Sequence, residues 1–207
     1  MQINSIDWWN DEFTYRWNIV NIGDKQTTYF ANLFVDNLNT ELSNELNKNY
    51  TAIDVGCALG GLVYLFKNKF PKLDIVGMDF SKIAIENAKI IYPKNKFICG
   101  TIEDSPEKFD IVITSNTLEH YHSPLIEIEK QMSKCNYLYF ALVPYNQKNI
   151  EGTSHFYSFK KEDFPMDLFG FKKIYQKIII SHDKYFWNGY QILNVYRRSG
   201  MCIEVIL

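Results

Sequence analysis

The residues best suited to chemistry surround a glycine-containing segment, Ile53 to Gly61, which reads Ile-Asp-Val-Gly-Cys-Ala-Leu-Gly-Gly. Its small residues let the backbone approach a ligand closely, and a helix that begins behind them would present free N–H groups to an anion. Asp79 follows 19 residues after Gly60, at a position where a carboxylate can accept hydrogen bonds from both hydroxyls of a ribose. The pattern predicts a site for a cofactor that contains a nucleoside.

Two cofactors fit this pattern. Gly56-x-Ala58-x-x-Gly61 is a loosened form of the dinucleotide fingerprint, which on its own would predict a nicotinamide-dependent oxidoreductase. Asp54, however, lies two residues before Gly56, where its carboxylate would repel a pyrophosphate. S-adenosylmethionine (SAM) has no phosphate and carries an ammonium group, beside which an acidic residue is favourable. We therefore predict SAM and keep NAD(P) as the alternative.

Four histidines are candidates for the general base that a hydroxyl acceptor would need. His155 follows the fifth expected strand and is our predicted catalytic base, with a loop histidine bonded to backbone as the alternative. His120 lies just past the fourth expected strand, at the edge where open α/β sheets bind ligands, with either a structural or a catalytic role. His122 and His182 are expected at the surface. Acidic residues and histidines do not cluster along the chain with the spacing of metal ligands, so no metal is predicted.

Strands and helices alternate in the segments that must position these residues. Apolar runs predict strands over 51–55, 73–78, 97–99, 110–115 and 137–143, the last closed by Pro144. Helices are expected after the glycine segment, after Ser81 and after Ser123-Pro124. Two more strands, 171–180 and 191–197, are expected to form an antiparallel hairpin around a loop over 181–189. Alternation of this kind implies a parallel sheet with right-handed crossovers.

The 207 residues predict one domain with an N-terminal helical lead (1–48) and a core (49–207). The lead contains an aromatic run from Trp8 to Trp17, either a lid over the site or a strip that packs on the sheet edge. A net charge of −2 implies no nucleic-acid partner and no acidic membrane surface. No signal peptide opens the chain and no apolar run could span a bilayer, so a cytoplasmic protein is expected. The oligomeric state stays open.

Three motifs, in this order along the chain, resemble those of the class I SAM-dependent methyltransferases of the small-molecule branch. Asp54 to Gly60 resembles the acidic-x-Gly-x-Gly-x-Gly loop, and Gly77 to Ser81 resembles the acidic motif of the second strand. Phe109 to His120 ends in Leu-Glu-His and resembles the fourth-strand motif, which dehydrogenases do not share. The resemblance covers roughly residues 45 to 200. It implies a Rossmann-like α/β fold with a seven-stranded, mostly parallel sheet, an antiparallel C-terminal hairpin strand, and helices on both faces.

The resemblance also implies which residues hold the cofactor. The methionine part would lie against Asp54 and the glycine-loop backbone, the ribose against Asp79, and the adenine between Phe80 and Ile102. Glu103 or Asp104 would replace the aspartate that accepts the adenine amino group in many relatives. The complete set of implied cofactor-binding residues is Asp54, Gly56, Cys57, Ala58, Gly60, Asp79, Phe80, Ile102, Glu103, Ser115 and Asn116.

The predicted function is methyl transfer from SAM to a small-molecule acceptor, with S-adenosylhomocysteine as the product. A sugar hydroxyl in glycan or natural-product biosynthesis is the preferred acceptor, and residues of about 145–170 are expected to bind it. The segment Ser115-Asn-Thr-Leu118 lacks the Pro-Pro-Tyr-like turn of relatives that methylate nucleic-acid amines, so DNA is disfavoured. The alternatives are an NAD(P)-dependent oxidoreductase and a non-catalytic SAM-binding regulator or partner subunit.

Overall fold

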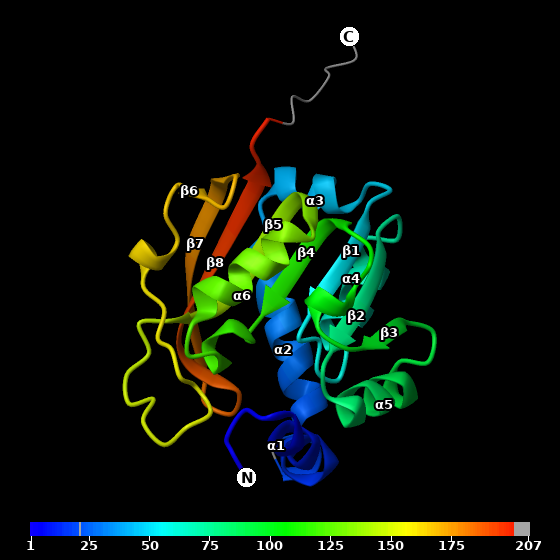
Figure 1. Ribbon diagram of the computed structural model, residues 1–207, viewed down its shortest axis with the longest axis vertical. Helices are drawn as coiled ribbons and strands as arrows, with labels where there is room; N and C mark the ends of the chain where they lie inside the picture. The colour runs from blue at the N-terminus through cyan, green and yellow to red at the C-terminus, as the bar shows by residue number, and fades with distance from the viewer. Residues whose placement is uncertain (21, 201–207) are drawn as a thin grey trace.

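One mixed sheet of eight strands, in the order β3-β2-β1-β4-β5-β8-β7-β6, organises the molecule (Figure 1). The computed structural model describes residues 1–20 and 22–200. The first five strands pair in parallel, and β8, β7 and β6 continue the sheet antiparallel. The strands are β1 (Thr51–Val55), β2 (Asp74–Asp79), β3 (Lys96–Cys99), β4 (Phe109–Ser115), β5 (Cys135–Tyr145), β6 (Asp167–Leu168), β7 (Phe171–Asp183) and β8 (Trp187–Arg198).

This sheet confirms the predicted α/β fold and corrects three of its details. The two-residue β6 adds an eighth strand to the seven predicted. Strand β5 does not end at Pro144, because its partner β4 has already ended opposite Leu142, so the missing N–H of the proline faces no ladder there. The predicted 181–189 loop is a turn of residues 184–186, in which Asp183 Oδ1 accepts hydrogen bonds from the N–H groups of Tyr185 (2.8 Å) and Phe186 (2.9 Å).

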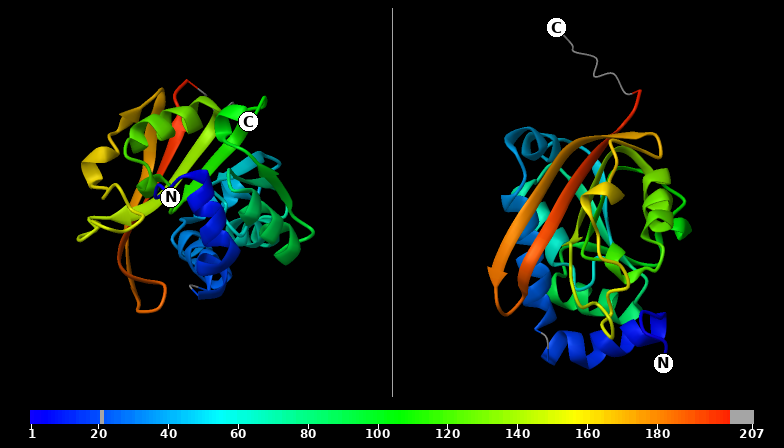
Figure 2. Two further views of the ribbon diagram at one scale, coloured as in Figure 1. Left: turned by 60° about the horizontal axis from the view of Figure 1, so that its bottom comes forward. Right: turned by 90° about the vertical axis from the view of Figure 1, so that its left-hand side faces the viewer.

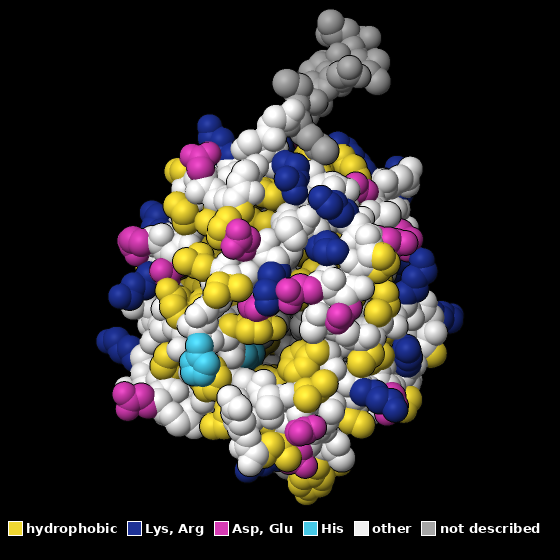
Figure 3. All heavy atoms as spheres, viewed as in Figure 1, with side chains coloured by type: hydrophobic (Ala, Val, Ile, Leu, Met, Phe, Trp, Pro, Cys, Tyr) yellow, Lys and Arg dark blue, Asp and Glu magenta, His cyan; other side chains and the backbone are white. Residues whose placement is uncertain are grey.

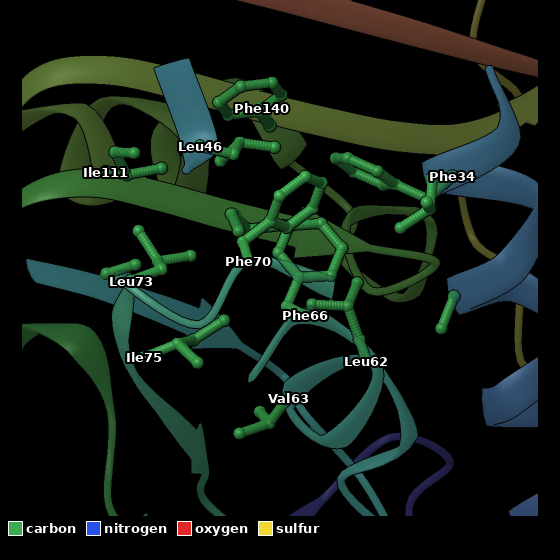
Figure 4. Packing of buried hydrophobic residues seen from close by; sticks show 14 of the residues in the cluster. Phe34, Leu46, Leu62, Val63, Phe66, Phe70, Leu73, Ile75, Ile111 and Phe140 are labelled. Atoms are coloured by element: carbon green, nitrogen blue, oxygen red, sulfur yellow. The ribbon is translucent and has the colours of Figure 1, made fainter. Parts of the chain in front are cut away.

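Helices cover both faces of the sheet (Figure 2). The first face is covered by α2 (Gly23–Asp36), α3 (Thr40–Leu46), α4 (Gly61–Lys69) and α5 (Lys82–Ile91), and the second by α6 (Pro124–Ser133). Phe34 of α2, Phe66 of α4 and Phe140 of β5 meet in the core of the first face, with ring centroids 5.4 and 5.8 Å from that of Phe34 (Figure 4). Phe159, Phe164 and other residues of the 145–170 segment fill the second face beside α6. Both layers hold the central strands rigidly.

The N-terminal residues form α1 (Ile6–Asp11), which continues as the π-helix η1 (Glu12–Val20). Figure 1 shows this unit across the edge of the sheet at which the parallel strands end. Three short 3₁₀ turns, η2 (Ile102–Asp104), η3 (Leu118–His120) and η4 (Lys161–Asp163), lie in the loops. No helix of the described residues has both the length and the apolar character needed to cross a membrane.

Candidate active site

The glycine loop turns sharply between β1 and α4. Gly56 has φ +77° and Gly60 has φ +82°, a region that favours glycine. A Cβ atom on Gly56 would lie 2.4 Å from the side chain of Thr117, and one on Gly60 would lie 2.5 Å from the ring of Phe97. Ala58 adopts φ +47° without being glycine. The loop is therefore pressed against the turn after β4, which contains Thr117, and against β3, and it leaves its outer side to a ligand.

Two buried carboxylates end the neighbouring strands. Asp54 is 2% exposed, and burial, helped by the nearby charge of Asp79, raises its pKa to about 8. Asp79 is held by the backbone: Oδ2 accepts from Ala58 N–H at 3.0 Å and Oδ1 from Ser81 N–H at 2.8 Å. Burial raises the pKa of Asp79 to about 6 against the effect of those two bonds. Such a pair favours a ligand that brings a positive charge or hydroxyl donors.

Three cavities follow one another along this edge, and Gly56 borders all of them. The first, of about 70 Å³, is lined by Asp54, Cys57 and Ser115 among others. The second, of about 110 Å³, lies beneath the N-terminal unit. The third, of about 240 Å³, contains Asp79, Ile102 and further residues of the turn after β3. Their order matches the methionine part, the ribose and sulfonium, and the adenine of SAM, so the residues present fit this cofactor.

Ten of the eleven residues predicted to hold the cofactor line these cavities. The exception, Gly60, is the left-handed N-cap of α4. Glu103 borders the adenine-sized cavity but pairs with Lys130 at 2.9 Å. Asp104 accepts from both Thr101 N–H and Thr101 Oγ1–H at 2.8 Å, so its carboxylate stabilises the turn η2 instead of facing the cavity. Of the two residues proposed to accept the adenine amino group, only Glu103 borders the 240 Å³ cavity that is assigned to the adenine.

Several lining residues were not predicted from the sequence. Thr117 and Tyr121 flank the Leu-Glu-His motif and could have been found by extending it one residue to each side. Asn4 has no signal in the sequence, because it reaches the cavity from the chain terminus. Thr27, Phe30 and Leu62 also line the site and were not predicted, whereas Trp9, Phe13 and Trp17 belong to the aromatic run for which a lid was one of the two predictions.

The aromatic N-terminal unit roofs the middle cavity. Trp9 stacks on Phe13 at 5.5 Å and meets the ring of His120 edge-on at 4.9 Å. Asn10 Oδ1 accepts from Ser81 Oγ–H at 2.7 Å, which ties α1 to the start of α5. Asn4 Nδ2 donates to the carbonyls of His120 (3.0 Å) and Ser154 (2.7 Å). The aromatic side chains therefore pack at the sheet edge and also line the middle cavity, and their role as a lid stays a prediction.

The fold brings His155 and His120 together. Their ring centroids are 5.0 Å apart, and burial lowers the pKa of His155 to about 4 and that of His120 to about 3. Glu119, 1% exposed, lies beside them, and one possible ligand atom from each of the three side chains is within 4.8 Å of the others. The spacing of acidic residues and histidines along the chain does not reveal this group, because the fold brings His155 to Glu119 and His120 from a distant segment. His122 and His182 are exposed, as predicted.

Figure 3 shows a hollow near the centre of this face of the molecule, with histidine and acidic side chains around its margin. The site is thus an enclosed space at the carboxyl edge of a parallel sheet, which is the general ligand-binding position of open α/β sheets. Sheet order, glycine loop and paired carboxylates together define a Rossmann-like protein that binds a nucleoside cofactor.

Comparison with known proteins gives the family. A family model described as a methyltransferase domain matches residues 46–164. The chain is 29% identical over 111 residues to malonyl-(acyl-carrier protein) O-methyltransferase of Priestia megaterium, which covers 50% of this chain and 40% of that protein. The protein of the same name from Anoxybacillus flavithermus is 24% identical over 127 residues, covering 57% of this chain and 49% of that protein. The chain spans less than half the length of these two relatives.

A solved structure with a similar fold is magnesium protoporphyrin IX methyltransferase of Synechocystis with bound SAM. It matches with a TM-score of 0.59 at 16% identity, over 96% of this chain and 86% of that chain. At that identity the likeness concerns the fold alone. With the family model, it shows that the chain belongs to the class I SAM-dependent methyltransferases. SAM is its cofactor, and the nicotinamide alternative is set aside.

Proposed function

We propose that this enzyme transfers the methyl group of SAM to an oxygen atom of a small molecule that enters beneath the N-terminal unit. The middle cavity carries this proposal, because it joins the cofactor residues Asp79 and Asn116 to His120 of the histidine pair. Methyl transfer requires an acceptor within about 3 to 3.5 Å of the activated methyl in a space that excludes water. The roof of Trp9 and Phe13 meets the second requirement, which makes residues 1–20 a lid.

Oxygen is favoured by the chemistry of the site and by the relatives. Both relatives named above are O-methyltransferases by name, and they act on malonyl-(acyl-carrier protein). Burial lowers the pKa of His155 to about 4, so its imidazole is uncharged at neutral pH and has a free lone pair. This lone pair can take a proton from a hydroxyl, and an acidic or polar acceptor that raises the pKa again would make His155 a more efficient base. A sugar hydroxyl and a carboxylate are the two acceptor classes to separate, because only the hydroxyl needs a base.

The cofactor residues have distinct proposed tasks. Asp54 binds the ammonium of the methionine part, and Asp79 accepts hydrogen bonds from the ribose hydroxyls. Phe80 and Ile102 pack on the adenine, with Glu103 near its amino group. When bound, SAM supplies an electrophilic methyl group, and the chain orients it toward the space beside His120.

An acceptor panel tests the proposal. Purified enzyme with SAM is offered sugars, free carboxylic acids and malonyl-(acyl-carrier protein), and S-adenosylhomocysteine is measured as the product. We expect turnover with an oxygen acceptor and, if it is a hydroxyl, a loss of about 10²- to 10⁴-fold in His155→Ala. Intact turnover in that variant would remove His155 as the base. Tight binding of S-adenosylhomocysteine without turnover on any acceptor would favour the regulator alternative.

A further inference from the structure

We propose that Glu119, His120 and His155 bind a divalent transition-metal ion beside the acceptor cavity. Glu119 and His120 come from the turn η3, and His155 comes from the irregular segment after β5. One carboxylate oxygen and one nitrogen from each imidazole lie within 4.8 Å of one another. Two imidazoles and a carboxylate form a donor set found at protein metal centres with open coordination positions.

Both imidazoles are oriented as metal ligands usually are. His120 Nδ1 lies 2.9 Å from the carbonyl oxygen of Ser154, and His155 Nδ1 lies 2.7 Å from Oε1 of Gln147. Because these oxygens only accept hydrogen bonds, each Nδ1 must carry the proton and each Nε2 the lone pair. Donation of the second ring N–H to a carbonyl is the arrangement that fixes the tautomer of a metal-binding histidine.

Glu119 supplies the second, independent indication of a ligand. Its side chain is almost completely buried, and its Oε2 has no hydrogen-bond partner within the described part of the chain. The backbone carbonyl of Glu119 accepts from the N–H groups of Phe156 (2.8 Å) and Tyr157 (3.1 Å), which ties the backbone of η3 to the segment that carries His155. A buried carboxylate oxygen without a partner is costly, and a bound cation would compensate for it.

The donor types select the metal. Two nitrogen donors favour Zn²⁺ or another first-row transition ion over Mg²⁺ and Ca²⁺, which prefer oxygen ligands. Ligand atoms around a tetrahedral ion with bonds of 2.0–2.2 Å are about 3.4 Å apart, so small side-chain rotations must draw the three groups together. The remaining position would face the cavity that His120 lines. There, and resting on the proposed function, an acceptor hydroxyl bound to the ion would lose its proton more readily. With the ion bound, the lone pair of His155 is a ligand, so the ion would replace His155 as the group that activates the hydroxyl.

A titration of the full chain, without a histidine tag, with Co²⁺ tests the site directly. Co²⁺ reports its ligands through visible absorption, and Zn²⁺ is then used to displace it. We expect one equivalent to bind, and Glu119→Gln and His155→Gln to weaken binding by at least tenfold. His182→Gln is the matched control, because His182 is exposed on β7 and lies outside the cluster. Mg²⁺ at the same concentration is expected not to displace Co²⁺.

A further variant separates the loss of metal binding from a failure to fold. Gln147→Ala leaves all three ligands in place and removes only the hydrogen bond that orients His155, so we expect metal affinity to fall about 10- to 100-fold. Binding of S-adenosylhomocysteine by each variant shows that it is folded. The proposal is overturned if the wild type binds no Co²⁺, or if Glu119→Gln and His155→Gln bind it as the wild type does. No acceptor is used, so failure of the metal site and failure of the proposed methyl transfer remain distinguishable.

Discussion

The cofactor half and the acceptor half of this site are built in different ways. Cofactor residues lie at the ends of β1, β2 and β4, where the parallel register sets Asp54 opposite Gly77 on one side and Ile113 on the other. The residues proposed to meet the acceptor come from the chain terminus, the turn η3 and the irregular segment after β5. Side-chain to backbone bonds, such as those of Asn4 to His120 and Ser154, hold these pieces together.

The difference teaches that a sheet edge fixes functional groups through regular pairing, whereas the acceptor half depends on individual contacts. A substitution in the cofactor half should therefore lower stability by an amount that follows from the backbone conformation and from the close packing of neighbouring strands. A substitution at a position with the same backbone conformation in the acceptor segment should lower stability only through that conformation. The four tests below each set one residue of one half against a residue of the other.

The largest contrast is expected between Gly56→Ala and Gly152→Ala. The two glycines have φ of +77° and +76°, but a Cβ on Gly56 would meet Thr117 at 2.4 Å while one on Gly152 would meet nothing within 4 Å. The left-handed conformation should cost each variant about 1–2 kcal/mol. Overpacking should cost Gly56→Ala about 1–3 kcal/mol more. Urea denaturation measures both losses of stability, and equal losses would contradict a loop pressed against Thr117.

Asp79→Asn should weaken cofactor binding without unfolding the protein. Loss of a charged acceptor for the ribose hydroxyls is expected to cost about 1–3 kcal/mol, or roughly 5- to 150-fold in the dissociation constant of S-adenosylhomocysteine. Asp74→Asn, at the exposed start of the same strand, is the control within this half. His155→Gln, from the acceptor half, should bind S-adenosylhomocysteine within about twofold of the wild type. Calorimetric titration with S-adenosylhomocysteine measures these affinities. An unchanged affinity in Asp79→Asn would show that Asp79 does not bind the ribose.

The pH dependence of cofactor binding should arise from titration of the buried carboxyl groups and not from titration of the histidines. Without ligand, the pKa of Asp54 is raised to about 8, so below pH 8 its carboxyl is mostly protonated. The ammonium of the ligand prefers the ionised form, so binding releases a proton and affinity for S-adenosylhomocysteine should rise from pH 6 to pH 8, by up to about tenfold per pH unit. Asp54→Asn should remove most of this slope and leave only the part near pH 6 that comes from Asp79, whose pKa is about 6. His155→Gln should keep it, because a pKa of about 4 leaves that imidazole neutral over the whole range.

The same contrast explains what the sequence can predict. Strand β1, the glycine loop and Asp79 could be predicted from the sequence. A run of apolar residues indicates the strand, and small residues that let the backbone approach a ligand indicate the loop, and both are local properties of the chain. The roles of Asn4 and Gln147 depend on contacts with partners 116 and 8 residues away, and neither contact has a periodic or compositional trace. The predicted loop over 181–189 is longer than the observed turn 184–186, because alternation of apolar and polar side chains weakens at the ends of β7 and β8, where Tyr190 is exposed.

The end of β5 and the Glu119, His120 and His155 cluster escape the sequence for a common physical reason. Pro144 predicts the end of β5, although the ladder on that side has already ended. Glu119 and His155 are far apart along the chain, so their contact has no trace in the spacing of the residues. In both cases the outcome depends on which strand or side chain lies next to the residue in the folded protein. A single sequence predicts such contacts only where they follow the regular pairing of strands.

The smallest effect is expected for Ala58→Gly. Ala58 has φ +47°, a conformation that costs a residue with a Cβ about 1–2 kcal/mol in the folded protein. Replacement by glycine removes this cost, but it lowers stability by about 0.4–1 kcal/mol because the unfolded chain gains conformational entropy. The free energy of unfolding should rise by about 0.5–1 kcal/mol. Asn146→Gly, at φ +49° in the acceptor segment, should gain nothing, because asparagine tolerates this conformation better than alanine.

Denaturation midpoints of the two variants measure this difference, and cofactor affinity shows what it means for the loop. The N–H of residue 58 donates to Asp79 Oδ2 at 3.0 Å whichever side chain it carries. If Ala58→Gly is more stable and binds S-adenosylhomocysteine as the wild type does, that backbone bond is sufficient to hold the loop in its binding shape. A more stable variant with weaker binding would mean that the methyl group of Ala58, which borders both the 70 Å³ and the 110 Å³ cavities, contacts the cofactor itself.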